Sequence, residues 1–557
     1  MSETSWIQRL TEHLRDQTRA SRTDLQSEIG NRLISAKDYT YFMDDINLLA
    51  IDEDHVNPTT WPAFEVSILL SEAFFHAVQG VFPFILREDF LNRLLRFPRD
   101  TAYLSWTDRH WLATANLVWA VGSKWLHMSH LAAPGFCDHH LMYYARARAL
   151  GIDHRVMFDH PDIGRVEAIG TLAFYLMING SVTRAYNTLG HAIRHAIALG
   201  LHLTVTDPSV KPLDRLRRAM AWHALYSLEV LLGEIMGRPT SISISNVTIP
   251  ISIFEETDKT GLERLPQPDE QTDLQKTKWL WVQFLNQQRG VQKQMTDNPT
   301  PWSNFPTAGE RFPSSHFPYR LRLCHLSDKI GIQLYTGHVD HPWSEIQRRT
   351  REIQTELRQW LDTLPPELAL QGGAPTSDVD SRIQLELNMY YQSVQMILHR
   401  PCLCEVEIAG ESLSSQAFNR DCARACVHAA VSMLAIFPDN LNAHEAYQLL
   451  PWWTLLHYLA QATSVLLLEL SLNSQHLSSN EIGELIYHLK KAMAYLRCMS
   501  EGSLSAYRLW RMFRQLLNQI RTRYGDLDVA DIPHQAPKPQ GWTEADETSL
   551  RNAFSFA

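Results

Sequence analysis

The sequence predicts an all-α fold. Apolar residues recur at the 3.6-residue period of a helix, glycines follow two of the helical stretches, and convincing strands are absent. Val166, Ile169 and Ala173, for example, fall on one helix face. The stretch from Ile242 to Ile253 alternates only weakly between apolar and polar residues, so we expect an extended loop there. The chain is therefore expected to form a large multi-helix domain.

The pattern divides the chain into a polar, acidic N-terminal segment, a first helical half, a polar loop insertion, a second helical half and a C-terminal tail. In that order, the segments are residues 1–60, 61–255, 256–315, 316–525 and 526–557. Asp44–Asp54 alternates acidic with aliphatic residues and is interpreted as a connector. The insertion is rich in Gln, Asp, Thr and Pro, although Trp279, Trp281 and Phe284 indicate one short helix inside it. From about Gln535 the chain is expected to be irregular.

The centre of the first half predicts two helices that each end at a glycine. The first helix is expected over Val182–Leu199, and Gly200 follows as a stop because glycine adopts the left-handed conformation at little cost. The second helix is expected to begin near Leu213 and to end before Gly237, where Pro239 prevents its continuation.

Composition and charge argue against DNA binding by this chain alone. The 557 residues are 45% hydrophobic and 20% charged, which suits a globular core, and the formal net charge is −10. A protein that contacts phosphates over a broad face usually shows a basic excess or a basic block. The densest basic runs, Arg215–Arg218 and Arg348–Arg351, lie in amphipathic stretches and are interpreted as solvated helix faces.

The cysteines and histidines do not predict a metal site. Four of the seven cysteines fall within 25 positions, but their spacing does not match the close pairs of a structural zinc site. They are interpreted as buried thiols on helices; the four are Cys402, Cys404, Cys422 and Cys426. His191 and His195 share a helix face, but the glutamate of a His-Glu-x-x-His site is missing. We therefore expect no cofactor in this chain.

No motif predicts catalysis, secretion or membrane insertion. The sequence lacks a Gly-x-Ser-x-Gly elbow, a Walker phosphate loop and a Gly-x-Gly-x-x-Gly turn, so we expect no enzyme activity. The N-terminus has no basic stretch followed by an apolar one, and no window is apolar enough to span a bilayer. These features predict an intracellular protein without a membrane partner.

Several blocks, in order, resemble a known family. Phe82–Leu86 resembles the "F-P-I-L" segment and Tyr143–Arg148 the "Y-Y-x-x-A-R" helix of the regulatory (middle homology) domain of fungal zinc-cluster (Zn2Cys6) transcription factors. The chain departs from the pattern at Arg87, where histidine is common, and at Ala219, which replaces a third arginine. The further matching positions, interpreted as fold-maintaining, are Leu199, Gly200, Leu201, His202, Arg217, Arg218, Trp222, Gly237, Arg238, Pro239, His399, Arg400 and Pro401.

The resemblance implies a transcriptional regulator that acts in the nucleus on a metabolic or secondary-metabolite gene cluster. The implied partners are the transcriptional machinery or a DNA-binding protein, together with a small-molecule effector. The six-cysteine zinc cluster is not in this sequence, so DNA contact is expected to come from a partner or from a cluster lost or missed upstream, and zinc is expected only in the latter case. Two alternatives stay open: a helical scaffold or corepressor without DNA contact, and a helical enzyme acting on a hydrophobic metabolite.

Overall fold

A computed structural model confirms the all-α prediction. No strand occurs among the residues whose structure it describes, and the segment between Ile242 and Ile253 is extended apart from short helical turns. The described residues are 40–43, 47–78, 80–98, 104–152, 160–254, 268–295, 316–335, 342–370, 381–404, 411–524, 528–529 and 531–554.

The first half of the chain contains a series of helices between an N-terminal 3-10 turn and a second 3-10 turn after the last helix. These elements are η2 (Glu53–His55), α2 (Phe64–Val78), α3 (Arg87–Arg96), α4 (Trp106–Met128), α5 (His140–Ala149), α6 (Ile163–Ile178), α7 (Val182–Ala198), α8 (Pro212–Met236) and η3 (Ile244–Asn246).

The second half continues with helices up to the end of the described chain. These elements are α10 (Pro268–Met295), α11 (Phe317–Ile330), the π-helical η4 (Gly331–Tyr335), α12 (Trp343–Asp362), η5 (Pro366–Leu368), α13 (Ser381–Cys404), α14 (Leu413–Ala435), α15 (Ala443–Leu449), α16 (Leu455–Ser471), α17 (Ser479–Met499), α18 (Leu504–Tyr524) and α19 (Glu544–Phe554).

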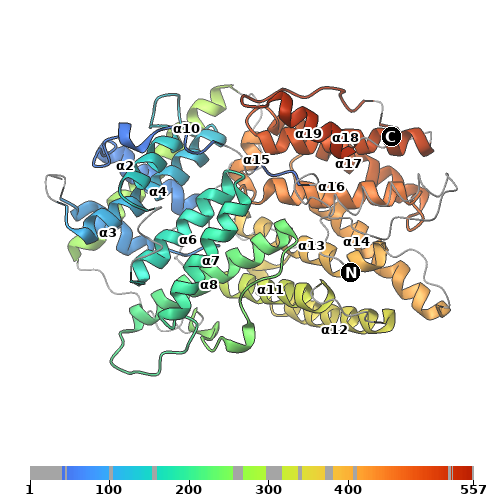
Figure 1. Ribbon diagram of the computed structural model, residues 1–557, viewed down its shortest axis with the longest axis horizontal. Coiled ribbons are helices and arrows are strands. Elements are labelled where there is room, and N and C mark those ends of the chain that lie inside the picture. Colours follow the sequence, from blue (N-terminus) through green and yellow to red (C-terminus); the bar gives the residue numbers. More distant parts are fainter. Residues whose placement is uncertain are drawn as a thin grey trace.

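The two halves form neighbouring groups of helices that share one core (Figure 1). Helices α2–α8 gather at one end of the molecule and α11–α19 at the other, with α8 packed against α11 between them. Indole hydrogen bonds also cross the boundary: Trp125 of α4 donates to the Tyr447 carbonyl oxygen at 3.0 Å, and Trp452 donates to the Ala77 carbonyl oxygen at 3.2 Å. Burial of the apolar faces of these helices is the main source of stability.

The predicted polar insertion contains a long docked helix. We expected one short helix within residues 256–315, but α10 spans 28 residues and packs against α2 and α3, next to the first half (Figure 1). Trp281 and Phe284 are buried against other aromatic rings, whereas Trp279 is exposed. A few large aromatic residues fix this helix although its other positions are polar. Residues 255–267 and 296–315 lie outside the described residues.

The two ends of the described chain also pack on the helices. The tail prediction for residues 526–557 is wrong over α19 and the segment before it, because Trp542 is buried with its ring centroid 4.8 Å from that of Tyr507. In the N-terminal segment, Tyr41 and Leu48 are buried. Residues 1–39 and 44–46, which include most of that segment, lie outside the described residues.

Candidate functional site

Two central helices end at glycines, as the sequence predicts. Gly200 follows α7 with φ +65°, and Leu201 is buried immediately after it. Gly237 ends α8 with φ +63°, and the N–H of Arg238 then donates to the carbonyl oxygen of Gly233 at 2.9 Å. The left-handed conformation costs a residue with a side chain about 1–2 kcal/mol, so both positions favour glycine.

Two arginines of α8 bind neighbouring helices. Arg218 donates from Nη2 to the carbonyl oxygens of Leu199 and Gly200, at 2.8 and 3.3 Å, and so supplies a donor to the Leu199 carbonyl at the end of α7. Arg217 donates two hydrogen bonds of 2.6 Å to the buried carboxylate of Glu167 on α6. Burial raises the pKa of Glu167 and the hydrogen bonds from Arg217 oppose that rise.

The other matched positions are divided between the core and a cavity. The His202 ring lies 5.5 Å from the buried Trp222 ring, between centroids. His399 is buried in α13, and Pro401 lies inside the last turn of that helix. Arg400, between them, places its guanidinium carbon 5.5 Å from the ring centroid of Tyr335.

One cavity brings two of the matched elements together. The turn after α8, Gly237–Pro239, lines a cavity of about 140 Å³ that Arg400 of α13 also lines. Residues of α11, η4 and α16 add to its wall, and so do Tyr41 and Phe42 of the N-terminal segment. The cavity therefore lies where the two halves of the fold meet.

Two carboxyl groups lie in this cavity in different surroundings. Glu234 of α8 accepts hydrogen bonds from the hydroxyls of Ser327 and, at 3.4 Å, Tyr390. Asp328 of α11 accepts from the hydroxyls of Tyr226 and Thr240, each at 2.9 Å. Burial raises the pKa of Glu234 to about 7, and burial also raises the pKa of Asp328.

A histidine and a tyrosine that also line the cavity lie next to each other. The Tyr41 hydroxyl lies 3.3 Å from Nδ1 of His457 on α16. Burial lowers the pKa of His457 to about 4 and raises that of Tyr41, so both side chains are neutral at physiological pH.

Our reading of the sequence missed these cavity residues. Two features of the sequence pointed to them. Glu234 directly follows the apolar run Leu231–Gly233, and His457 is the one histidine in the apolar helix α16. An ionisable residue within an apolar stretch of a helix is expensive to bury without a partner. Neither signal tells which distant helix faces the residue.

The thiols are buried on two packed helices, as expected. Cys402 of α13 and Cys422 and Cys426 of α14 are buried and unbridged. Contact with the Cys402 thiol, and next with the His399 ring, lowers the pKa of Cys422. The Cys404 side chain lies outside the described residues. Among the side chains described, no group of three or more His, Cys, Asp and Glu residues is arranged to hold a metal ion.

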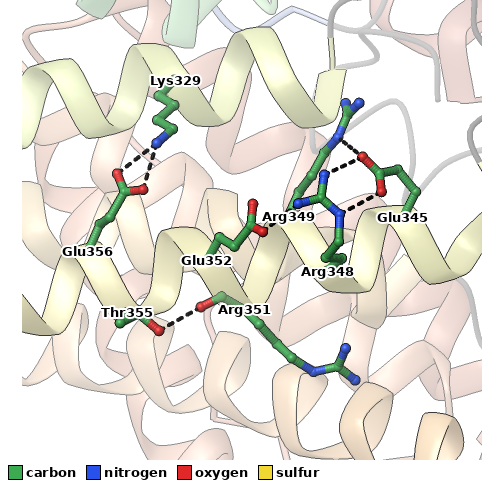
Figure 2. Close-up of polar contacts among 8 residues, drawn as sticks. All are labelled: Lys329, Glu345, Arg348, Arg349, Arg351, Glu352, Thr355 and Glu356. Carbon is green, nitrogen blue, oxygen red and sulfur yellow. Dashed lines mark hydrogen bonds and ion pairs between the residues drawn. The ribbon is translucent and has the colours of Figure 1, made fainter.

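Two arginines in the basic run of α12, Arg348 and Arg349, pair with acidic residues of the same helix (Figure 2). Arg348 pairs with Glu345 at 2.6 Å and with Glu352, and Lys329 of α11 reaches Glu356 at 2.6 Å. Hydrogen bonds from Arg348 and its neighbour lower the pKa of Glu345 to about 2. The charges of Arg348 and Arg349 are thus paired with carboxylates.

The last arginine of the α12 run, Arg351, is exposed, as expected of a solvated face, and its guanidinium carbon lies 4.0 Å from the ring centroid of Phe418.

The other basic run, Arg215–Arg218, differs from the prediction. In Arg215–Arg218, however, the three arginines are half-buried and bind backbone carbonyls or Glu167. The solvated-face interpretation is wrong there, because the long side chains lie against the protein surface and bind a loop carbonyl, the Glu167 carboxylate and the end of α7.

No helix among the described residues combines the length and the apolar character needed to span a bilayer.

Comparison with known families and proteins gives consistent matches. The family model of the fungal specific transcription factor domain matches residues 72–362. The chain is 25% identical to the "Transcription regulator galc" of Aspergillus niger, over 99% of this chain and 70% of that protein. It is 23% identical to the "Transcription factor FBD3" of Gibberella moniliformis, over 73% of this chain and 51% of that protein.

A shorter match is to the "Probable transcription factor gsfR1" of Penicillium aethiopicum, with 32% identity over 25% of this chain and 21% of that protein. The alignments thus span 70% of the Aspergillus niger protein but only about half of the Gibberella moniliformis protein. No solved structure matches the chain.

Proposed function

Because this chain belongs to the family of the fungal specific transcription factor domain, we propose that it works as a regulator of fungal transcription in the nucleus. The observation that carries the proposal is the family match over residues 72–362, together with the similarity to a transcription regulator along 99% of the chain. We propose further that its targets form a metabolic or secondary-metabolite gene cluster and that the chain is not an enzyme.

DNA contact, in this proposal, comes from a DNA-binding partner or from a zinc cluster outside this sequence. The net charge of −10 disfavours a broad phosphate interface. The two densest basic runs bind carboxylates, backbone carbonyls and an aromatic ring of the chain itself. In a gel-shift titration the purified chain should show no sequence-specific binding at any salt concentration; specific binding that weakens steeply as salt rises would contradict this part.

The cavity at the end of α8 is the site we propose for a small-molecule effector. It joins the turn Gly237–Pro239 of the first half to Arg400 of the second, so an occupant would contact both halves. A ligand shifts an equilibrium between two arrangements only if it binds them with different affinity. A cavity between two helix groups offers such a difference, because its shape depends on how the groups are packed.

The regulatory role can be tested by fusing the full chain to a heterologous DNA-binding domain in a filamentous fungus. We expect reporter transcription to change severalfold, up or down, relative to the DNA-binding domain alone. A reporter without the operator is the matched control. Disruption of the native gene should change the transcripts of a contiguous set of genes. An unchanged reporter together with an unchanged transcript profile would refute the proposed function.

A further inference from the structure

Basic side chains gather where the end of α4 meets the start of α5. Lys124 and His127 lie on one face of α4, three positions apart, and His139 and His140 lie at the start of α5. The centroid of the His139 ring lies 6.2 Å from that of His127 and 4.3 Å from that of His140. Burial lowers the pKa of His139 and of His140, and the charge of Lys124 lowers both further. The four side chains therefore act on one another and form one basic cluster.

The lysine of the basic cluster has no hydrogen-bond or ion-pair partner among the residues that the structure describes. The Lys124 side chain is half-buried, and burial lowers its pKa to about 8, so the ammonium group is still charged at neutral pH. An ammonium group has three N–H donors and no acceptor. A half-buried cation without acceptors costs free energy, and a bound group with negatively charged oxygen atoms would recover it.

Two histidines of the basic cluster differ in the protons that they offer. Nδ1 of His139 accepts from the N–H of Leu141 at 3.4 Å, so the neutral His139 ring carries its proton on Nε2, where it is a donor. Nδ1 of His127 lies 2.8 Å from the carbonyl oxygen of Ser123 and therefore carries the proton of that ring. His127 gains a second N–H only when it takes up a proton. Lys124 and His139 thus donate at neutral pH, and His127 donates through Nε2 once it is charged.

The carboxylates around the basic cluster have partners elsewhere. Asp138, next to His139, binds Arg146 at 2.9 Å. In α4 and the described elements packed against α4 and α5, the exposed acidic residues are Glu65 and Asp54. The buried and half-buried acidic residues of these elements are paired, Glu53 with Arg148, Glu72 with Arg87, Asp108 with Arg93, Glu167 with Arg217 and Glu445 with Asn440. None of these carboxylates shifts the pKa of Lys124, His139 or His140, so the basic cluster lacks a counterion in the described structure.

The surroundings of the basic cluster add to its positive potential. The first N–H groups of a helix have no partner within the helix, and the helix dipole places partial positive charge there. The first turn of α5 contains no acidic residue to offset that charge. The rings of His130 and His444, with centroids 3.3 Å apart, add two titratable groups near His127. A negative ligand is favoured here over a metal ion, because no three His, Cys, Asp or Glu side chains are arranged to hold one in the described structure.

We propose that the basic cluster binds the oxyanion group of a small molecule, a phosphate or a carboxylate, through Lys124 and His139 and, at lower pH, His127. Lys124 and His127 are half-buried and His139 is exposed, so a molecule from solution reaches them. No residue of the basic cluster lines the cavity at the end of α8, and this site is therefore distinct from the one proposed above for an effector. Binding is a property of the purified chain and does not depend on the proposed regulatory role.

The first test compares methanesulfonate with methanesulfonamide, which has nearly the same shape and no charge. Each is titrated into the purified chain at constant ionic strength and followed by ligand-detected NMR of its methyl protons. At about pH 7 we expect the Kd of methanesulfonate to be at least about tenfold lower, because charged oxygen atoms accept stronger hydrogen bonds from an ammonium group. Equal binding of the two compounds would overturn the proposal.

Acetate and methyl phosphate distinguish the two oxyanion classes. A Kd of either compound at or below that of methanesulfonate supports the proposal and identifies the class of group that the site prefers. Weaker binding of both compounds than of the uncharged methanesulfonamide would overturn it.

Binding of methanesulfonate should strengthen as the pH falls. A bound anion favours the charged forms of the nearby histidines and of Lys124, so binding is coupled to proton uptake. Methanesulfonate keeps its charge throughout, and the change therefore comes from the protein. We expect the Kd at about pH 6 to be at least about fivefold lower than at about pH 8, where a histidine ring is neutral and Lys124 is charged in only part of the molecules. A Kd that stays constant over this range would overturn the assigned donors.

Two substitutions locate the site. Lys124→Met should raise the Kd of methanesulfonate at least about tenfold, and His139→Asn, which keeps an acceptor at the N-terminus of α5, should raise it about threefold or more. Lys329 and His428 are matched controls. Lys329 is half-buried like Lys124 and His428 is exposed like His139, but both pair with carboxylates of the protein. Lys329→Met and His428→Asn should leave the Kd within about twofold.

An equal loss of affinity in Lys124→Met and Lys329→Met would overturn the proposal, and so would unchanged affinity in Lys124→Met. If a variant fails to fold, the comparison of methanesulfonate with methanesulfonamide in the unmodified chain still decides the outcome. None of these results depends on DNA or on a reporter, so a failure here is distinct from a failure of the proposed regulatory role.

Discussion

Removing Arg320 alone should destabilise the protein more than removing both Arg320 and its partner Glu386. The Arg320 Nε of α11 donates to Glu386 Oε1 of α13 at 2.8 Å, and the two residues are only 2% and 1% exposed. The guanidinium carbon also lies 5.4 and 4.9 Å from the ring centroids of Phe82 and Tyr390. Arg320→Met leaves an uncompensated buried carboxylate, which costs about 3–5 kcal/mol.

The double substitution Arg320→Met with Glu386→Leu should cost little. The ion pair is incompletely satisfied, because Arg320 Nη1 and Glu386 Oε2 lack hydrogen-bond partners in the described part of the chain. Desolvation of such a pair offsets most of its attraction, and apolar replacements of similar volume are often neutral or stabilising. We expect the double variant to lie within about 1 kcal/mol of the unmodified protein.

Thermal unfolding at a fixed scan rate measures the difference. For 557 residues that unfold as a unit, 1 kcal/mol corresponds to about 1 °C in Tm. Arg320→Met should therefore lower Tm by about 3–5 °C, and the double variant should change it by about 1 °C or less. Equal losses in the single and double variants would refute the reasoning, because the loss would then come from packing against the aromatic rings and not from the unpaired charge.

Three further predictions use the same measurement. Gly237→Ala should lower stability by about 1–2 kcal/mol, since φ at this position is +63°; an unchanged Tm would contradict the assigned turn. Arg218→Met should cost about 1–2 kcal/mol because the Leu199 carbonyl loses its donor, and more than Arg215→Met, whose side chain binds at an exposed turn. Because the folded-state pKa of Glu234 is raised from 4.5 to about 7, the folded state binds its proton more tightly, and stability falls as pH rises from 4.5 through 7. The Tm of the unmodified protein relative to Glu234→Gln should therefore drop between pH 5 and pH 7.5, and a constant difference would exclude the raised pKa.

The helices and their ends could be predicted where local rules decide them. The predicted helix Val182–Leu199 is α7, and Gly200 and Gly237 follow the helices they were expected to end, because a left-handed stop depends only on neighbouring residues. The prediction of a mostly irregular insertion failed because local rules do not decide the structure there. Its average polarity predicts a loop, but Trp281 and Phe284 dock α10 through contacts with distant parts of the chain.

The cavity could not be predicted because its parts are far apart in the sequence. Tyr41 and His457 are separated by 416 positions, and periodicity does not show which helix face meets which. The roles of Arg217 and Arg218 could be predicted only in part. Their match to the family motif could be read from the sequence, but only the structure shows that one binds the end of α7 and the other Glu167.

The spread of the cavity wall along the chain has a consequence for synthesis. Its residues run from Thr40 to Ser464, so the site is absent from a nascent chain until α16 has left the ribosome. A ligand of this site can stabilise only a chain that includes α16 and cannot assist the folding of the first half alone. Neither half, produced as a separate fragment, would contain the site, and a split protein would regain it only after the two fragments associate.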